Sequence, residues 1–204
     1  MQTLQTRQDL YSVMAQRRSI RVLGNREILS PKDLEALIAR ALQFSPTAFH
    51  AQEQRAVLLL KNQHNWFWNL LENKLRTIVP AENFPDTQKK LKGFAGGVGT
   101  IFVYQDTHVT KGLQEKFPAY RDNFPLWAQQ ASGILKYTLW TSLVAEGYGV
   151  SLQHYTELIE EEVQRGLNIP SSWKMMGQIP FGTPEETPEE KDFMPLDQQF
   201  LIFS

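Results

Sequence analysis

The chain contains 204 residues, which suits one domain or a compact pair and is long enough to bury a core without covalent cross-links. Lys and Arg total 21 against 22 for Asp and Glu, so the formal charge of -1 gives the whole protein no polyanion-binding character. The absence of cysteine excludes disulfides, thiolate metal sites and a cysteine nucleophile, and it fits a reducing compartment.

No stretch of the sequence has the pattern of a targeting or membrane segment. The N-terminal residues lack an apolar core of signal-peptide length, and no window approaches the roughly 18 apolar residues of a membrane span. We therefore expect a cytoplasmic protein with no membrane partner and no nucleic-acid partner.

The first predicted helix covers residues 3–16, with Leu10, Val13 and Met14 on its buried side. The sequence RRSIR follows at residues 17–21 and sets three guanidinium groups around one hydroxyl. Runs of charge usually lie in solvent, and cations also suit the negative end of a helix dipole. The alternative is that a bound anion holds the arginines together, and the charge pattern alone leaves both interpretations open.

A second helix, a polar loop and a strand follow in order. The start SPKD at residues 30–33 resembles a capping box, and apolar residues at helical spacing follow over 34–42. The proline and small residues of SPTAFHAQ, residues 45–52, predict a loop. The unbroken apolar run at residues 56–60 predicts a buried strand directly after it.

The remaining pattern alternates between helices and strands. Apolar spacing predicts helices at residues 65–79, 125–146 and 157–169, and β-branched and aromatic content predicts strands at residues 98–105, 148–155 and 174–182. The 125–146 helix is apolar around most of its circumference, as expected of a heavily buried or interface helix. An acidic tail at residues 183–191 leads to an apolar ending, which suggests an arm reaching a distant sheet. With no repeat or linker, we expect one α+β domain over residues 1–204.

Several common site motifs are absent from the sequence. There is no Walker-type phosphate loop, and the glycine cluster at residues 93–99 precedes a strand, so it predicts a turn and not a dinucleotide fingerprint. The four histidines lack metal-ligand spacing, so no metal site is predicted. No G-x-S-x-G elbow exists, which leaves hydrolysis as a weak alternative. The tryptophans favour core and interface packing, with Trp127 and Trp140 as the candidates for substrate contact.

Four features remain that could carry chemistry. They are the arginine segment 17–21, the polar loop 45–52, the segment SLQHY at residues 151–155, and Lys191 in the tail. Together they supply cations and a hydroxyl for a phosphate, amide and imidazole groups for a polar ring, and aromatic rings for stacking. This inventory suits flavin mononucleotide (FMN), although each part alone is common in proteins.

The order of these motifs resembles the FMN-dependent nitroreductase family, in particular a short branch similar to the yeast fatty-acid-repression protein and bacterial nitroreductase-like proteins. RRSIR corresponds to the family's R-x-S-x-[KR], and SPTAFHAQ to its S-P-S-S-x-N-x-Q loop. Residues 140–155 correspond to the helix, turn and strand at the far side of the flavin, and residues 173–184 to the penultimate strand. The resemblance covers almost the whole chain. It implies a nitroreductase-like fold, with a central mixed β-sheet flanked by helices and a C-terminal arm that reaches the partner subunit.

The resemblance also implies roles for individual residues. Arg17 and Arg21 would contact the phosphate and ribityl chain, Ser19 would add a hydroxyl, Arg18 would contribute mainly its main chain, and Lys191 matches a late phosphate-binding lysine. Because the family places its flavin at a dimer interface, the other subunit would supply Thr47, Ala48, His50 and Gln52. The isoalloxazine would lie beside Leu152, Gln153 and His154, where main-chain N–H groups can reach its N5 and O4.

Two positions depart from the family pattern. His50 stands where the family has asparagine, and Phe193 stands where it has an arginine two residues after the late lysine. The first change affects the ring contacts, and the second removes a phosphate cation that Arg18 could replace. Without the resemblance, His50 and His154 would be ordinary loop histidines, and Lys191 a solvated charge in an acidic tail.

The resemblance implies a homodimeric enzyme that takes a hydride from NADH or NADPH onto FMN and reduces a nitroaromatic, a quinone or a similar small-molecule electron acceptor. Donor and acceptor would use one pocket in turn, in a ping-pong scheme, and no residue is assigned as a catalytic acid or base. One alternative is a flavin-binding regulatory module, linked to lipid or stress response, with little turnover. Another is an interaction protein that has lost FMN because Phe193 replaces the arginine.

Overall fold

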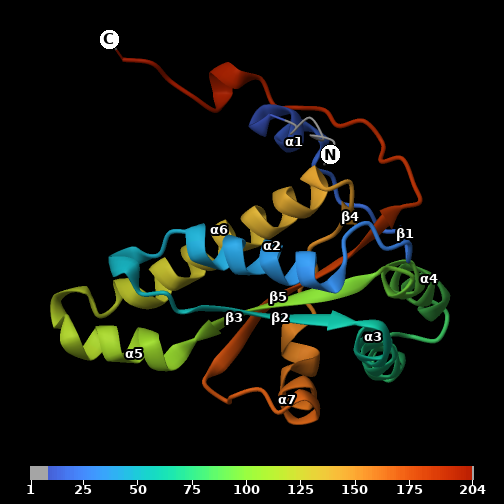
Figure 1. Ribbon diagram of the computed structural model, residues 1–204, viewed down its shortest axis with the longest axis horizontal. Helices are drawn as coiled ribbons and strands as arrows, with labels where there is room; N and C mark the ends of the chain where they lie inside the picture. The colour runs from blue at the N-terminus through green and yellow to red at the C-terminus, as the bar shows by residue number, and fades with distance from the viewer. Residues whose placement is uncertain (1–8, 204) are drawn as a thin grey trace.

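The computed structural model describes residues 9–203 and places helices on both faces of a central sheet (Figure 1). Within these residues, no helix combines the length and apolar character that a membrane crossing requires. The helices are α1 (Leu10–Gln16), α2 (Pro31–Phe44), α3 (Lys61–Arg76), α4 (Phe84–Ala95), α5 (Thr107–Lys116), α6 (Asn123–Ala145) and α7 (Thr156–Leu167). The strands are β1 (Leu23–Gly24), β2 (Gln54–Leu60), β3 (Gly99–Asp106), β4 (Gly149–Val150) and β5 (Trp173–Pro184).

The sheet has the strand order β1-β5-β3-β2, and β4 adds to β5. All of these ladders are antiparallel, and the parallel component of the expected mixed sheet is an isolated bridge between Ser19 and Val150. The β3–β5 register shifts at Val103 and Tyr104, opposite Gly177, whose φ of 154° suits a glycine. This bulge lies beside the segment that carries His154.

Alternating side chains of β3 divide the core into two layers. Ile101 and Val103 pack against α2 and α6, whereas Phe102 and Tyr104 pack against α3, α4 and α7. Figure 1 shows α2 and α6 together on one side of the sheet and α7 on the other. The α+β architecture expected from the sequence, a central sheet flanked by helices, is confirmed.

The start of α2 illustrates how local sequence sets an element. Ser30 caps the helix by accepting a hydrogen bond from the Asp33 N–H at 3.2 Å, and Pro31 occupies the first turn. The buried residues recur at helical spacing, namely Leu34, Leu37, Ile38 and Ala41. The predicted helix and its cap are therefore confirmed.

The burial predictions for α1 and β2 need correction. In α1, Val13 is buried, but Leu10 and Met14 are exposed, because this short helix packs against α6 through one side only. The predicted helical residues 3–8 lie outside the described residues. The run 56–60 does form part of β2, yet only Leu59 in it is buried, because β2 is an edge strand of the sheet.

Other segments also differ from the sequence expectations. Helices α4 and α5 had not been predicted. The predicted strand at 148–155 is reduced to β4 and a bridge at Gln153. The α6 helix is buried along one face, whereas Leu126, Ile134 and Tyr137 on it are exposed, so the expected heavy burial holds for that face alone. Residues 185–203 contain no strand; the arm runs past α1 in Figure 1, and its apolar ending is exposed.

Candidate functional site

The arginine segment begins where α1 ends. Arg17 is the C-terminal cap of α1, and its guanidinium lies over the Trp140 ring of α6, 4.7 Å from the ring centroid. Two residues later, Ser19 forms the parallel bridge to Val150, and the buried Ile20 donates its N–H to the Val150 carbonyl at 2.9 Å. The segment is therefore attached directly to the strand that leads to His154.

Residues 151–155 run along β5 with alternating hydrogen bonds. The N–H of Ser151 donates to the Pro180 carbonyl at 3.1 Å, and that of Gln153 donates to the Gln178 carbonyl at 2.8 Å. The intervening N–H groups, those of Leu152 and His154, face the opposite side and donate to no protein group within residues 9–203. Two neighbouring donors are thus available to a ligand.

Side chains on β5 and in the segment itself fix this conformation. The Gln178 side chain is fully buried, and its Oε1 accepts the Tyr155 N–H at 2.8 Å. The Gln153 amide donates to Ser151 Oγ at 2.9 Å, so this side chain supports the segment from within. A Cβ at Gly177 would lie 3.3 Å from the Gln153 carbonyl oxygen, so glycine permits the close approach.

The polar loop has an unusual backbone for its residue types. Phe49, His50 and Gln52 have φ angles of 57°, 52° and 52°, in the left-handed region that non-glycine residues seldom occupy. Inside the loop, the Gln52 N–H donates to Thr47 Oγ1 at 3.0 Å. Asn and His are among the residues that tolerate this conformation best, so His50 is a compatible replacement for the family's asparagine.

An aromatic cluster surrounds the Phe49 side chain. Its ring centroid lies 5.1 to 5.9 Å from those of Phe117, Tyr120, Phe124 and Trp127. Ala48 and Thr47 join Phe49 and Trp127 in lining an adjacent cavity of about 470 Å³, a volume in the range of small-ligand pockets.

The structure brings three of the four candidate groups together in one chain. The arginine segment is bonded to Val150, as described above. The tail lies beside it, because Arg18 donates to the Glu189 carbonyl and Glu186 accepts the Arg21 N–H. Lys191, two residues past Glu189, is exposed.

The polar loop is not part of this assembly. It packs at Trp127 on α6, whereas Arg17 packs at Trp140 on the same helix. Thirteen residues of α-helix separate these positions by about 20 Å. Within one chain, Thr47, Ala48, His50 and Gln52 therefore lie apart from the arginines.

Comparison with known proteins identifies the family to which the chain belongs. A family model described as "Nitroreductase family" matches residues 14–183. The chain belongs to the nitroreductase family. In Saccharomyces cerevisiae, the HBN1 protein is 31% identical over 169 residues, covering 83% of each chain, and nitroreductase FRM2 is 29% identical over 162 residues, covering 79% of this chain and 80% of FRM2.

A solved structure extends this likeness. Nitroreductase CinD from Lactococcus lactis, in complex with chloramphenicol, is 36% identical and superposes with a TM-score of 0.88 over 96% of this chain and 100% of CinD. The protein is an oxidoreductase of the nitroreductase type.

Two basic residues of this nitroreductase, Lys136 and Arg55, were not identified as candidates from the sequence. Lys136 is the single charged residue of α6, a signal that could have marked it. Its ammonium group donates to the Met176 carbonyl at 3.2 Å, and burial lowers its pKa. Burial also lowers the pKa of His154, and the positive charge of Lys136 lowers it further. Both effects favour the neutral form of His154.

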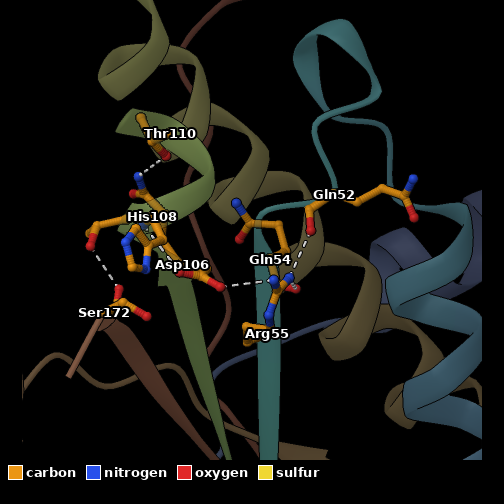
Figure 2. Close-up of polar contacts among 9 residues, drawn as sticks. Gln52, Gln54, Arg55, Asp106, His108, Thr110 and Ser172 are labelled. Atoms are coloured by element: carbon orange, nitrogen blue, oxygen red, sulfur yellow. Dashed lines mark hydrogen bonds and ion pairs between the residues drawn. The ribbon is translucent and has the colours of Figure 1, made fainter. Parts of the chain in front are cut away.

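The other missed residue is Arg55, which lies in β2 three residues after the end of the polar loop. Its guanidinium bonds the Gln52 carbonyl and the Asp106 carboxylate (Figure 2). No local pattern marks it, because Asp106 lies 51 positions away in the sequence.

Proposed function

We propose that this protein is an FMN-dependent oxidoreductase that takes a hydride from NADH or NADPH and reduces a nitroaromatic, a quinone or a similar small acceptor. The observation that carries the proposal is the connection of the arginine segment, through Val150, to the free N–H groups of Leu152 and His154. That arrangement offers cations at one end, for the phosphate of FMN, and two neutral N–H donors at the other end, for its ring.

The residues present fit this cofactor. Arg17, Arg18, Arg21 and Lys191 provide positive charge for the phosphate, and Ser19 provides a hydroxyl. The N–H groups of Leu152 and His154 would bind ring atoms, where donors tune the redox behaviour of a flavin. When bound, FMN supplies the hydride acceptance and donation.

The protein's own part is binding and orientation. Donor and acceptor would use one pocket in turn, in a ping-pong scheme, and the aromatic surface of Phe49 and Trp127 offers them a stacking partner. No side chain is required as a catalytic acid or base, because water can supply protons.

The proposed active form is a homodimer. In this arrangement the polar loop of the partner subunit completes the site, which accounts for the separation of the loop from the arginines of its own chain along α6. The exposed apolar residues of the C-terminal arm would pack on the partner. With no cysteine in the chain, the protein fits the reducing cytoplasm, where nicotinamide donors are available.

The experiment is to purify the protein, identify any released flavin by chromatography, and titrate FMN into the apoprotein. Stopped-flow reduction by NADH and by NADPH, followed by an acceptor panel, then measures turnover. CinD has been solved in complex with chloramphenicol and with 4-nitrophenol, so both compounds belong in the panel. Recovery of FAD alone, or no binding of FMN, would refute the proposal. Tight FMN binding with negligible turnover would favour a regulatory flavoprotein.

A further inference from the structure

Arg55 connects the end of the polar loop to the sheet. Its Nη1 donates to two main-chain carbonyls, that of Gln52 at 2.7 Å and that of Gln54 at 3.0 Å. Its Nη2 donates to Asp106 Oδ2 at 2.9 Å. One planar group therefore holds the last loop residue, its own strand and the neighbouring strand (Figure 2).

The anchor for this guanidinium is itself rigid. The Asp106 side chain is 13% exposed, and its second oxygen accepts the His108 N–H at 3.1 Å at the start of α5. The Arg55 guanidinium also lies over the Trp173 ring of β5, 5.6 Å from its centroid. Arg55 lies in β2, and its partners Asp106 and Trp173 lie in β3 and β5. The position of the guanidinium group is therefore fixed by the sheet and not by the loop.

The loop needs such an anchor. Gln52 has a φ of 52°, and Phe49 and His50 share the left-handed conformation, which costs free energy at each non-glycine residue. The bond from Arg55 engages the Gln52 carbonyl, while Figure 2 shows the Gln52 side chain extending away from Arg55. The main chain is thus held, and the side-chain amide is left for a ligand.

We propose that Arg55 is a positioning residue for the flavin-binding loop. It fixes the Gln52 carbonyl, and with it the left-handed conformation of Phe49, His50 and Gln52. This role rests on the proposed function, because the loop is taken to contact FMN in the dimer. If the competent loop conformation becomes a minor state, the apparent dissociation constant for FMN rises in proportion to the loss of that population.

Arg76 provides a matched control. Its Nη2 pairs with Glu72 Oε1 at 2.7 Å, and its guanidinium lies 4.3 Å from the centroid of the Phe84 ring. It therefore has the same two kinds of partner as Arg55, a carboxylate and an aromatic face. No hydrogen bond joins it to a loop carbonyl within residues 9–203.

The test compares Arg55→Met with Arg76→Met by hydrogen exchange of the apoprotein and by FMN titration. The reporting amides are those of His50, Ala51 and Gln52, which bond within the loop. We expect Arg55→Met to speed their exchange and to raise the FMN dissociation constant about tenfold, corresponding to a loop that is competent about one tenth of the time. Arg76→Met should leave both unchanged. Arg55→Lys should rescue partly, because a compact ammonium group keeps the charge for Asp106 but lacks the planar fork whose two nitrogens reach the carbonyls and Asp106 separately.

Asp106→Asn is the second variant, in case Arg55→Met does not fold. Asparagine keeps the cap of α5 but removes the charge that holds Arg55, so the same two effects should appear at smaller size. Wild-type exchange rates in the loop, or wild-type FMN affinity, in folded Arg55→Met or Asp106→Asn would overturn the role. If the unaltered protein binds no FMN, the proposed function fails, and the exchange rates still decide whether Arg55 orders the loop.

Discussion

The N–H of Ile20 donates to the carbonyl of Val150 at 2.9 Å, which joins the arginine segment to the strand that precedes His154. Ile20 is buried and Val150 is fully buried, so this main-chain bond is protected from water. The phosphate end and the ring end of the proposed flavin site therefore belong to one rigid unit.

The role of the arginine cluster can be tested at Arg21. Its N–H bonds Glu186 through the main chain, so Arg21→Ala keeps that contact and removes the exposed guanidinium alone. A charge-assisted hydrogen bond contributes about 1.5 to 3 kcal/mol, so FMN binding should weaken by roughly ten- to a hundred-fold. Riboflavin, which lacks the phosphate, should bind as before. Arg26→Ala, an exposed arginine five residues later, is the control, and equal losses for both ligands in Arg21→Ala would contradict a phosphate contact.

The C-terminal arm predicts an obligate dimer. Leu201 and Phe203 are 73% and 90% exposed in the single chain, which is unusual unless a partner covers them. Sedimentation of the holoprotein should give twice the 23.5 kDa of one chain. Leu201→Ser combined with Phe203→Ser should raise the dimer dissociation constant at least about a hundredfold, whereas Ile78→Ser, at another exposed apolar position, should not. A stable monomer with full FMN occupancy would rule out a shared site.

Replacing Gln178 should change both the unfolding free energy of the protein and the midpoint potential of its bound FMN. Gln178→Leu removes the acceptor of the Tyr155 N–H in a fully buried site, which should cost about 1 to 3 kcal/mol of unfolding free energy. Because the same residue holds the segment beside Leu152 and His154, the midpoint potential of bound FMN should also shift. Gln164→Leu is the control, since its amide bonds the Trp173 carbonyl away from that segment. A shift of equal size in both variants would exclude a specific link.

The buried side chain of His64 should make the protein less stable as the pH falls below 6.5. Burial lowers its pKa below the ordinary 6.5. Its Nε2 faces the Ala95 carbonyl at 3.1 Å and so carries the proton, which leaves Nδ1 to accept from Thr100 Oγ1 at 2.9 Å. Below pH 6.5 the unfolded chain binds a proton that the folded chain refuses, so unfolding free energy should fall by up to about 1.4 kcal/mol per pH unit.

Urea unfolding at pH 7.5, 6.5 and 5.5 measures this loss. Glu27 and Lys61 line the cavity beside His64, and both stay in place in the variants. His64→Gln should reduce the dependence to the part that His154 contributes, since the pKa of His154 is also lowered, whereas His108→Gln, at an exposed position, should leave it as in the wild type. An unaltered slope in His64→Gln would assign the effect to other groups.

The fold was largely predictable because its main elements carry strong periodic patterns. The α2 helix has a cap and a regular apolar stripe, β3 has an unbroken run of β-branched and aromatic residues over 100–104, and β5 is rich in large apolar residues. The α4 helix escaped prediction because its apolar residues, Phe84, Leu91 and Phe94, are spread thinly among lysines between a proline-rich start and glycines. The burial of α1 and β2 was overestimated because a sequence pattern does not show which elements lie at the periphery of the fold.

The candidate site was predictable only in its local segments. The sequence RRSIR and the segment around His154 are recognisable by their residue types, and the structure joins them through Val150. Lys136 and Arg55 act through partners that are 40 and 51 positions away, and such pairings follow from the topology of the sheet. The use of the Gln153 side chain as an internal support also depends on the chain path along β5.

The separation of the polar loop from the arginines along α6 has a genetic consequence for the proposed dimer. An Arg21→Ala subunit and a Gln52→Ala subunit would each form defective homodimers, yet their mixed dimer would contain one site with both changes and one site with neither. Random assortment makes about half of the dimers mixed, so about a quarter of all sites would be intact. Two defective alleles expressed in one cell would therefore partly complement each other, whereas either allele expressed beside the wild type would leave about half of all sites intact, as gene dosage alone predicts.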